Sequence, residues 1–234
     1  MSVPVTILVC TYNDAEFLPR ALESCLIQGV DEIILVDDGS THEFPPDLWN
    51  TIRDGGITYV RHGKNGGLSA ARNTGFSLAR NEYVFPLDAD DWFYPDTIRK
   101  LYLAASASDW CVVACGDITQ GGKRHFPPMR QRRDQATNQC KATVGDWMSM
   151  NQMFAGSLVW RPAWRAVGGY LVLPHAHYED YRLWNTMIKY YGSAGGFKYV
   201  DALVYEHTPR ENSMLRQLHS RTAEFHRLAT EPLR

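Results

Sequence analysis

The first half of the chain alternates two patterns of apolar residues. Short continuous apolar runs are typical of buried strands, and stretches with an apolar residue every three to four positions are typical of helices that cover a sheet. Because a strand, a helix and a further strand in succession give parallel strands, this order predicts an α/β fold with helices on both faces of the sheet. The expected strands are Val3–Cys10, Glu32–Val36, Ile57–Arg61 and the run that begins at Tyr83; the expected helices between them are Ala15–Gln28, Asp47–Asp54 and the segment after Gly66 and Gly67.

The second half of the chain continues this alternation except in one long stretch. A helix is expected at Pro95–Ala107 and a strand at Trp110–Cys115. From Gly116 to Gln139, the glycines, prolines and basic residues predict a long mobile loop. The further expected elements are helices at Val144–Met150, after Arg161-Pro162, at Tyr181–Tyr191 and from about Met214 to Ala229, and strands at Gly156–Trp160 and Tyr199–Tyr205.

Polar residues follow each of the first strands, at Thr11, Asp37, Asn65 and Asp88. The carboxyl ends of parallel strands meet at one edge of a sheet, and α/β proteins bind their ligands at that edge. The sequence therefore predicts a single site to which all of these strand ends contribute.

The last of these strand ends is acidic, because Asp88, Asp90 and Asp91 lie within a few positions of one another. Grouped carboxylates repel one another unless they are solvated or a cation lies between them. Their oxygens suit a hard divalent ion such as Mn2+ or Mg2+. The alternative is a solvated acidic turn in which Asp91 caps the following helix.

Other stretches carry candidate chemistry, each with a simpler alternative. Glycines precede a predicted helix whose first backbone N–H groups, with Lys64 and Arg72, could bind an anion; the alternative is a loop that permits close packing. Glu179 and Asp180 open another predicted helix, where acids also interact favourably with the helix dipole. A basic set within residues 121–133 could contact an anionic partner or could form a solvated loop.

Length, composition and charge narrow the class of protein. The 234 residues have an ordinary globular composition, which predicts one compact domain with a C-terminal extension. The net charge of −2 argues against a surface that coats nucleic acid or membrane throughout. The five cysteines lack the paired spacing of a zinc site and indicate buried thiols in a reducing compartment. No transmembrane segment or leader is recognisable, so a cytoplasmic protein is expected, with a peripheral membrane contact left open.

The chain carries a set of motifs in a fixed order, namely Val9–Asn13, Val36–Thr41, Asn65–Asn73, Leu87–Asp91, Val167–Tyr170 and the pair Glu179-Asp180. With this set, the sequence resembles a family 2 glycosyltransferase of the GT-A fold over roughly residues 3–207. The resemblance implies a Rossmann-like, mostly parallel central sheet. It also implies a GT-A domain at 1–210, with a nucleotide-sugar-binding half at 1–115 and an acceptor and catalytic half at 116–210, and a helical extension at 211–234.

The resemblance also implies which residues bind the donor, a nucleotide-diphosphate sugar. Thr11 and Tyr12 would lie against the nucleobase, and Asp38 would accept from its imide N–H. Family members often carry an acid at the position of Asn13, which leaves the donor contact of Asn13 open. The further implied donor contacts are Asn65, Gly67 and Arg72 along the nucleoside and diphosphate, Asp88 toward the ribose, and Ala89.

The implied chemistry is transfer of a sugar, with inversion, to an acceptor hydroxyl. Asp90 would ligate Mn2+ or Mg2+, with His207 as a weaker candidate ligand. The metal would offset charge on the departing diphosphate. Asp180 would act as the general base, and Glu179 would support or orient it.

The motifs leave the substrates and two other functions open. The Gln-x-x-Arg-Trp motif and membrane helices of processive family members are missing, which favours transfer of a single sugar, with a UDP-sugar as the expected donor. The acceptor could be a glycan, a lipid-linked sugar or another hydroxyl compound, and an anionic acceptor and nucleic acid are left open. One alternative is a non-catalytic sugar-nucleotide-binding subunit. The other is a nucleotidylyltransferase, which would carry a basic, glycine-rich loop where Thr11–Asp14 stands.

Overall fold

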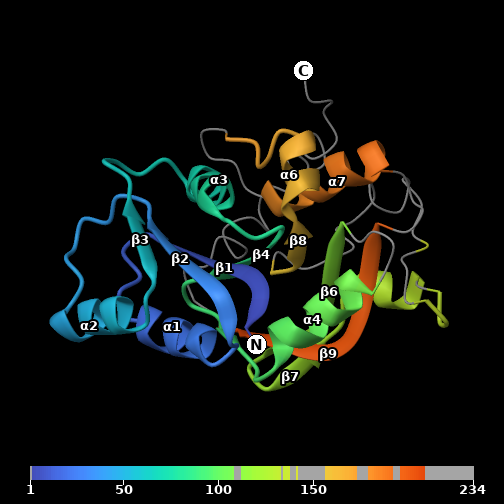
Figure 1. Ribbon diagram of the computed structural model, residues 1–234, viewed down its shortest axis with the longest axis horizontal. Coiled ribbons are helices and arrows are strands. Elements are labelled where there is room, and N and C mark those ends of the chain that lie inside the picture. The colour runs from blue at the N-terminus through green and yellow to red at the C-terminus, as the bar shows by residue number, and fades with distance from the viewer. Residues whose placement is uncertain are drawn as a thin grey trace.

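The computed structural model describes residues 2–107, 112–132, 134–137, 141, 156–172, 179–191 and 196–208. Their strands form one nine-stranded sheet in the order β3-β2-β1-β4-β8-β6-β9-β5, with β7 paired to β6 (Figure 1). The strands are β1 (Val3–Thr11), β2 (Val30–Asp37), β3 (Thr58–Arg61), β4 (Tyr83–Asp88), β5 (Trp92–Phe93), β6 (Val113–Gln120), β7 (Lys123–His125), β8 (Leu158–Trp160) and β9 (Phe197–His207).

The N-terminal strands confirm the predicted α/β arrangement. β2 and β4 flank β1, β3 lies outside β2, and all of these pairings are parallel. Beyond β4 the sheet becomes mixed, because β8 runs antiparallel to both β4 and β6, whereas β6 and β9 run parallel. The long ladders are parallel and the short ones antiparallel, which agrees with the expected mostly parallel sheet.

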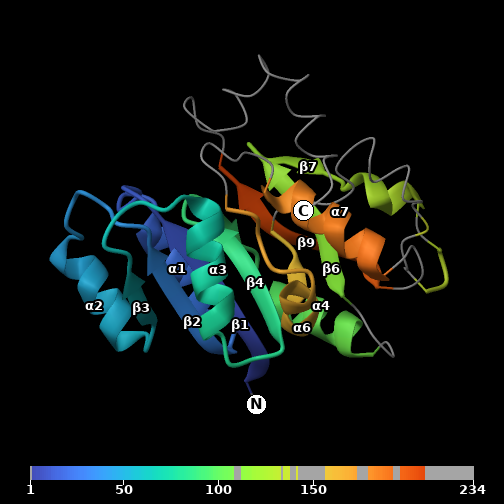
Figure 2. The same cartoon turned by 90° about the horizontal axis from the view of Figure 1, so that it is seen from above.

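Helices cover both faces of the sheet. One face carries α1, α2 and α4 and the other carries α3, α6 and α7, as Figure 2 shows from above. β1 is apolar because both of its faces are buried: Val5 and Ile7 join the core with α1, and Leu8 joins the core with α3. The helices are α1 (Leu18–Leu26), α2 (Pro46–Asp54), α3 (Leu68–Leu78), α4 (Thr97–Ser106), α6 (Arg161–Ala166) and α7 (Glu179–Tyr191).

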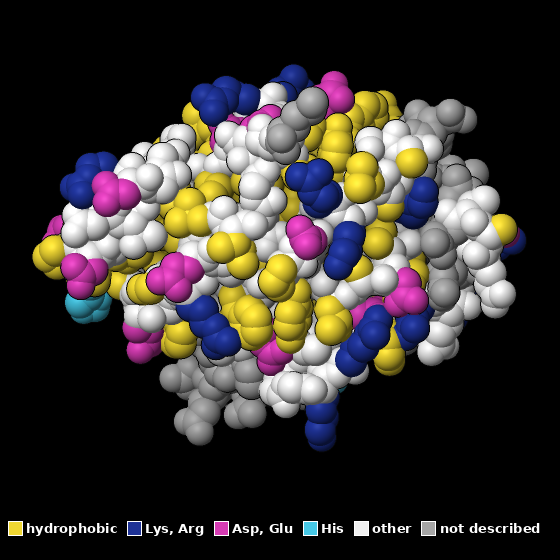
Figure 3. Space-filling view, turned by 60° about the horizontal axis from the view of Figure 1, so that its bottom comes forward, with side chains coloured by type: hydrophobic (Ala, Val, Ile, Leu, Met, Phe, Trp, Pro, Cys, Tyr) yellow, Lys and Arg dark blue, Asp and Glu magenta, His cyan; other side chains and the backbone are white. Residues whose placement is uncertain are grey.

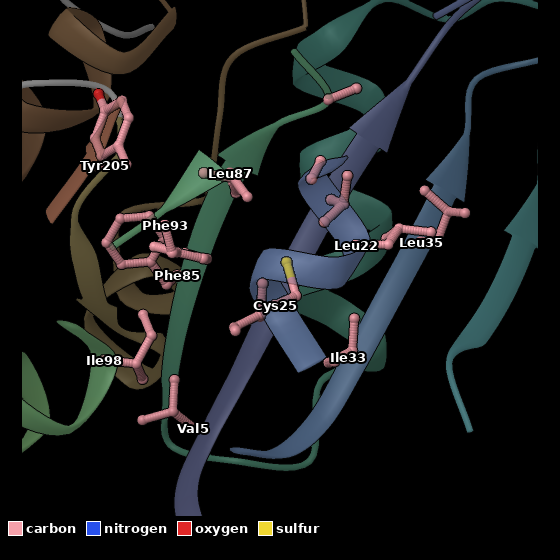
Figure 4. Packing of buried hydrophobic residues seen from close by; sticks show 14 of the residues in the cluster. Val5, Leu22, Cys25, Ile33, Leu35, Phe85, Leu87, Phe93, Ile98 and Tyr205 are labelled. Atoms are coloured by element: carbon pink, nitrogen blue, oxygen red, sulfur yellow. The ribbon is translucent and has the colours of Figure 1, made fainter. Parts of the chain in front are cut away.

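The core beneath α1 and α4 holds β4 and β5, the strands on either side of the acidic turn (residues 88–91). On the outside of this helical layer, apolar side chains are interspersed with charged ones (Figure 3). On the inside, Leu22, Cys25 and Ile98 belong to the same buried cluster as Phe85 of β4 and Phe93 of β5 (Figure 4). The Phe85 and Phe93 rings pack edge to face, with centroids 4.9 Å apart. Residues 88–91, which connect β4 to β5, are therefore anchored at both ends.

The expected mobile loop at Gly116–Gln139 is wrong for the residues that the structure describes there. β6 extends into this region and turns back into β7, and a 3-10 helix, η1 (Pro128–Arg132), follows. The apolar pattern did not reveal this part of β6 because Asp117 is charged yet completely buried, where it pairs with Arg124 and accepts from Tyr199. A buried ion pair interrupts the apolar run on which the prediction depended.

Three expectations fall outside the described residues: the helix at Val144–Met150, the helix from about Met214 to Ala229, and the extension at 211–234. The proposed domain division at residue 210 therefore stays a prediction. Among the helices that the structure describes, none is both long enough and apolar enough to cross a membrane.

Candidate functional site

The carboxyl ends of β1, β2 and β4 lie side by side, as their polar residues predicted. Thr11 pairs in register with Asp37, and Cys10 pairs with Asp88. The Thr11 side chain is buried, and its hydroxyl has no hydrogen-bond partner within the described parts of the chain. Buried hydroxyls normally have a partner, so this oxygen is a candidate contact for a ligand. Tyr12 exposes its ring at the same strand end.

The Asp38 carboxylate ties the loop after β2 to the loop before α3. Its Oδ1 accepts from the Gly66 N–H at 3.0 Å and its Oδ2 accepts from the Gly67 N–H at 2.7 Å. His62 Nδ1 lies 2.6 Å from Asp38 Oδ1, and the carboxylate is buried. Asn65 closes the same turn, since its Oδ1 also accepts from the Gly67 N–H at 3.0 Å. The anion bound by these glycine N–H groups is thus the protein's own carboxylate.

Close contacts also fix the neighbouring loops against each other. Gly39 has a φ of +78°, and a Cβ at this position would lie 2.7 Å from the backbone carbonyl carbon of Lys64. Asn13, which also has a positive φ, donates its N–H to Ser40 Oγ at 2.9 Å and accepts at Oδ1 from the Thr41 N–H at 2.8 Å. Asn13 therefore shapes the loop after β2, and its contact with a donor stays a prediction.

Asp91 is a structural residue, but its expected role as a helix cap is wrong. It is 3% exposed, its Oδ1 accepts from the Thr208 N–H at 2.9 Å, and this oxygen lies 3.2 Å from His207 Nδ1. Helix α4 begins only at Thr97, with Asp96 before it. Asp91 instead fastens the end of β9 to the acidic turn. The hydrogen bond with Asp91 raises the pKa of His207, against the opposing effect of burial.

Arg72 of α3 joins the acidic turn to the start of α7. Its Nη2 donates to Asp88 Oδ1 at 2.8 Å, and its Nη1 donates to Glu179 Oε1 at 2.5 Å. The guanidinium carbon lies 5.5 Å from the centroid of the Tyr170 ring. Burial alone would lower the pKa of Arg72, but Asp88 and Glu179 more than offset burial and raise that pKa well above its ordinary value. Predicted site residues from both halves of the chain therefore meet at one arginine.

Asp180, the second residue of α7, lies near two buried tyrosines to which the sequence gave no role. Burial raises the pKa of Tyr205, and the negative charges of Asp91, Asp88 and Asp180 raise it further. Burial also raises the pKa of Tyr170, to which Asp180 again contributes. No sequence signal distinguished Tyr205 from the other apolar residues of its strand, whereas Tyr170 stood within a recognised motif.

The segment that carries Tyr170 is held in place by Asn73 of α3. Asn73 Nδ2 donates to the Tyr170 carbonyl at 2.7 Å, and its Oδ1 accepts from the Tyr170 N–H at 2.8 Å. Gly169 has a φ of +76°, and a Cβ there would lie 2.8 Å from Asn73 Oδ1. The Gly-Gly-Tyr motif therefore forms a junction between α3 and the segment that follows α6.

The sequence model described as glycosyl transferase family 2 matches residues 6–201 of this chain. The chain belongs to this family. The uncharacterized glycosyltransferase EpsJ of Bacillus subtilis is 36% identical over 134 residues, which cover 53% of this chain and 37% of EpsJ. The succinoglycan biosynthesis protein ExoO of Rhizobium meliloti is 38% identical over 106 residues, which cover 44% of this chain and 30% of ExoO. The chain thus spans about a third of the length of these curated relatives.

Solved structures share the fold of this family 2 chain. S. aureus TarS 1–349 in complex with UDP-GlcNAc superposes with a TM-score of 0.70 at 19% identity, over 92% of this chain and 61% of that structure. The same fragment in complex with UDP gives a TM-score of 0.68, also at 19% identity, over 89% of this chain and 61% of that structure. This likeness confirms the expected GT-A arrangement of the sheet and its helices.

The acidic turn fits the divalent metal expected for the family if a ligand completes the site. Within the described ranges, no group of three or more histidine, cysteine, aspartate or glutamate side chains is placed to hold a metal ion. Mg2+ sites commonly combine one or two carboxylates with phosphate oxygens of the substrate, and Mn2+ also prefers such oxygens. Asp90 is partly buried, and its charge contributes to the raised pKa of His207. These hard oxygen ligands suit a metal that arrives with a diphosphate.

Proposed function

We propose that the chain transfers a single sugar from a nucleotide-diphosphate sugar to an acceptor hydroxyl, with inversion at the anomeric carbon and with Mn2+ or Mg2+. The observation that carries the proposal is the meeting of the acidic turn with the first residues of α7 through Arg72. This contact brings the acids proposed for the donor close to those proposed for the acceptor. Because TarS shares the fold and was crystallised with UDP-GlcNAc and with UDP, a UDP-sugar is the first donor class to test.

The donor contacts are proposed from the strand ends. The exposed ring of Tyr12 and the buried hydroxyl of Thr11 would lie against the nucleobase. Asp38 Oδ2 accepts from the Gly67 N–H and has a second lone pair for the imide N–H of the nucleobase. Asp88, whose side chain is 37% exposed, would accept from the ribose hydroxyls. The further proposed donor contacts are Asn13, Asn65, Gly67 and Ala89.

The metal would be held by Asp90 and the donor diphosphate, with His207 as a weaker candidate ligand. When bound, a divalent ion acts as a Lewis acid and offsets the charge that develops on the departing nucleotide diphosphate. Asp91 supports this arrangement from within the protein, since it holds His207 Nδ1 at 3.2 Å.

Asp180 is proposed as the general base. Its carboxylate would take the proton of the acceptor hydroxyl while the acceptor oxygen bonds to the anomeric carbon and the bond from that carbon to the diphosphate breaks. Attack from the side opposite the leaving group inverts the configuration. Glu179 Oε1 accepts a hydrogen bond from Arg72 Nη1 at 2.5 Å. This contact would fix the first turn of α7 and so orient Asp180.

A binding screen tests the donor. Nucleotide sugars, beginning with UDP-GlcNAc, are added with and without Mn2+, and the melting temperature of the protein is measured. A donor at a hundred times its Kd should stabilise the fold by about 2.7 kcal/mol, which is roughly 5–10 °C for a chain of this size. A protein that none of the nucleotide sugars stabilises would contradict the proposal.

Two variants test the chemistry, with UDP release as the measurement. Asp180→Asn should lower turnover by about 100-fold or more and leave UDP affinity nearly unchanged, because the amide cannot accept the proton. Asp90→Ala should weaken UDP binding in Mn2+ but not without metal. Asp54→Asn, on the exposed side of α2, is the matched control and should change neither quantity.

The same assays separate the alternatives. Donor binding without turnover, across a panel of glycan, lipid-linked and other hydroxyl acceptors, would favour a non-catalytic subunit. Release of pyrophosphate from a nucleoside triphosphate would favour a nucleotidylyltransferase. Full turnover in both Asp180→Asn and Asp90→Ala would remove the residue assignments.

A further inference from the structure

The Arg72 side chain is buried to a degree that an arginine rarely reaches. It is 2% exposed, and arginines are almost never fully buried unless they are paired. Both of its terminal nitrogens are paired, one with Asp88 and the other with Glu179, which is 107 positions further along the chain. Removal of a single partner from such a buried group is strongly destabilising. These contacts indicate that the Arg72 guanidinium holds other side chains of the protein in place.

The helix that carries Arg72 is itself held firmly. Gly75, one turn later, lies so close to β1 that an added Cβ would meet Leu8 Cδ1 at 2.1 Å. Asn73 fastens the same turn of α3 to the backbone of Tyr170 through hydrogen bonds of 2.7 and 2.8 Å. The guanidinium therefore extends from a helix that has little freedom to shift, and it can fix the positions of its partners.

The alternative for Arg72 is the direct contact with the donor diphosphate that the family resemblance implied. In the structure, however, the guanidinium faces two carboxylates and the Tyr170 ring. The Arg72 side chain is 2% exposed, so its remaining N–H groups offer little surface to a diphosphate. Displacement of Glu179 by a diphosphate would leave a buried carboxylate unpaired, which is costly.

We propose that Arg72 is a positioning residue that couples the donor side of the site to the acceptor side. It holds Asp88 with one nitrogen and Glu179 with the other, and it thereby sets Asp180 against the bound donor. The roles of Asp88 and Asp180 rest on the proposed function, whereas the bridge, meaning the contacts of Arg72 with Asp88 and Glu179, is formed by side chains of the protein itself. The planar guanidinium can hold two carboxylates in a fixed geometry, which the single ammonium group of lysine cannot do.

The bridge is tested first without any ligand, by thermal unfolding of Arg72→Met, Glu179→Gln and the double variant. Arg72→Met should lower the melting temperature by roughly 6–15 °C, because it removes one member of a buried charge network. The fall in melting temperature of the double variant should be clearly smaller than the sum of the falls in the two single variants. The control is Arg53→Met on α2: Arg53 pairs with Asp54, their side chains are 70% and 69% exposed, and the fall in melting temperature should be under about 2 °C. If the falls in melting temperature are additive, Arg72 and Glu179 are not coupled and the proposed bridge is wrong.

The positioning role is tested by turnover, with UDP-GlcNAc or the donor selected by the screen, Mn2+ present, and UDP release as the readout. Glu179→Gln should lower kcat by about tenfold or more, since small misplacements of a catalytic group are costly. It should leave UDP affinity within about threefold, because Glu179 reaches the donor only through Arg72. In the Arg72→Met background, Glu179→Gln should cause no further loss of kcat. Arg72→Lys, which keeps the charge, should recover part of the melting temperature but not kcat, and it replaces Arg72→Met if that variant does not fold.

The outcomes for the bridge and for the proposed function are distinguishable. A wild-type protein that neither binds UDP nor turns over any donor would count against the proposed function, and the unfolding experiment would still decide the bridge. If Arg72→Met weakens UDP binding by more than about tenfold and Glu179→Gln keeps its full effect in that background, Arg72 is a donor contact and the positioning role is overturned.

Discussion

At the scale of the residue, the Asp38 carboxylate holds the loop that precedes α3. Both of its oxygens accept from backbone N–H groups, of Gly66 and of Gly67, and one of them also lies against His62. Hydrogen bonds to a charged group contribute about 1.5–3 kcal/mol each. The loop before α3 therefore depends in large part on this side chain, with Asn65 Oδ1 as a further acceptor for the Gly67 N–H.

We expect Asp38→Asn to lower the free energy of unfolding by about 2 kcal/mol. One carboxylate oxygen becomes an amide NH2 group, which cannot accept the N–H of the glycine that it faces. Urea denaturation measures the loss, and Asp54→Asn on exposed α2 is the control, with an expected change within about 0.5 kcal/mol. A loss no larger than that of the control would show that the loop holds without the carboxylate.

The sequence predicted that the polar strand ends lie side by side, but not which groups their side chains contact. Asp91 illustrates the limit: its nearest plausible partner in the sequence was the helix that follows it, whereas its partner in the structure is the Thr208 N–H, 117 positions away. Local spacing reveals contacts within one element. Contacts between distant elements depend on how the sheet brings those elements together, and this chain offers no local signal for them.

At the scale of the element, Gly75 determines how closely α3 packs against β1. Gly75 faces β1, where Leu8 is completely buried and its Cδ1 would lie 2.1 Å from an added Cβ. We expect Gly75→Ala to lower the free energy of unfolding by about 1–3 kcal/mol, because overpacking forces the helix outward. Since Arg72 lies on this helix, kcat should fall as well.

The matched control is Gly63→Ala, where an added Cβ meets nothing within 4 Å and φ is not positive. Its free energy of unfolding should change by no more than about 0.5 kcal/mol. Equal stability of the two alanine variants in urea would mean that α3 and β1 adjust without cost. The close packing would then not be what positions Arg72.

The hairpin of β6 and β7 and the 3-10 helix after it carry the basic side chains that the sequence suggested for an anionic acceptor. Arg124 is not available for this role, because it pairs with Asp117 and Asp201. Arg130 packs on the ring of Phe126 at 3.9 Å, and that ring is 46% exposed. Arg130 and Arg132, which both lie on η1, are the residues chosen for neutralisation.

We expect Arg130→Gln combined with Arg132→Gln to raise the KM of a phosphorylated acceptor by about 3–10-fold at low salt and to leave a neutral acceptor unaffected. The difference should shrink as ionic strength rises, because salt screens exposed charges. Lys100→Gln, exposed on α4, is the control. An unchanged KM for the phosphorylated acceptor would remove this surface from the account of acceptor binding.

At the scale of the whole molecule, the site depends on contacts that join the parallel strands β1–β4 to the mixed part of the sheet. The first part could be predicted, because its strands are buried on both faces and read as continuous apolar runs, as in Ile33–Val36. The second part was predicted less well, since its strands contain buried charges such as Asp117. The two parts meet through Arg72 and Glu179 and through Asp91 and Thr208, which join residues more than a hundred positions apart.

The proposed metal site predicts how a divalent ion affects the melting temperature of the protein. Because no cluster of three or more protein ligands occurs in the described residues, we expect that chelation with EDTA leaves the melting temperature of the nucleotide-free protein within about 1 °C. Mn2+ alone should also have little effect at low concentration. Mn2+ together with UDP should raise the melting temperature by more than UDP alone, because the diphosphate oxygens would add to the Asp90 carboxylate as ligands of the metal. In Asp90→Ala this extra stabilisation should disappear while the effect of UDP alone remains. A fall of several degrees on chelation without nucleotide would instead reveal a metal site formed by the protein alone.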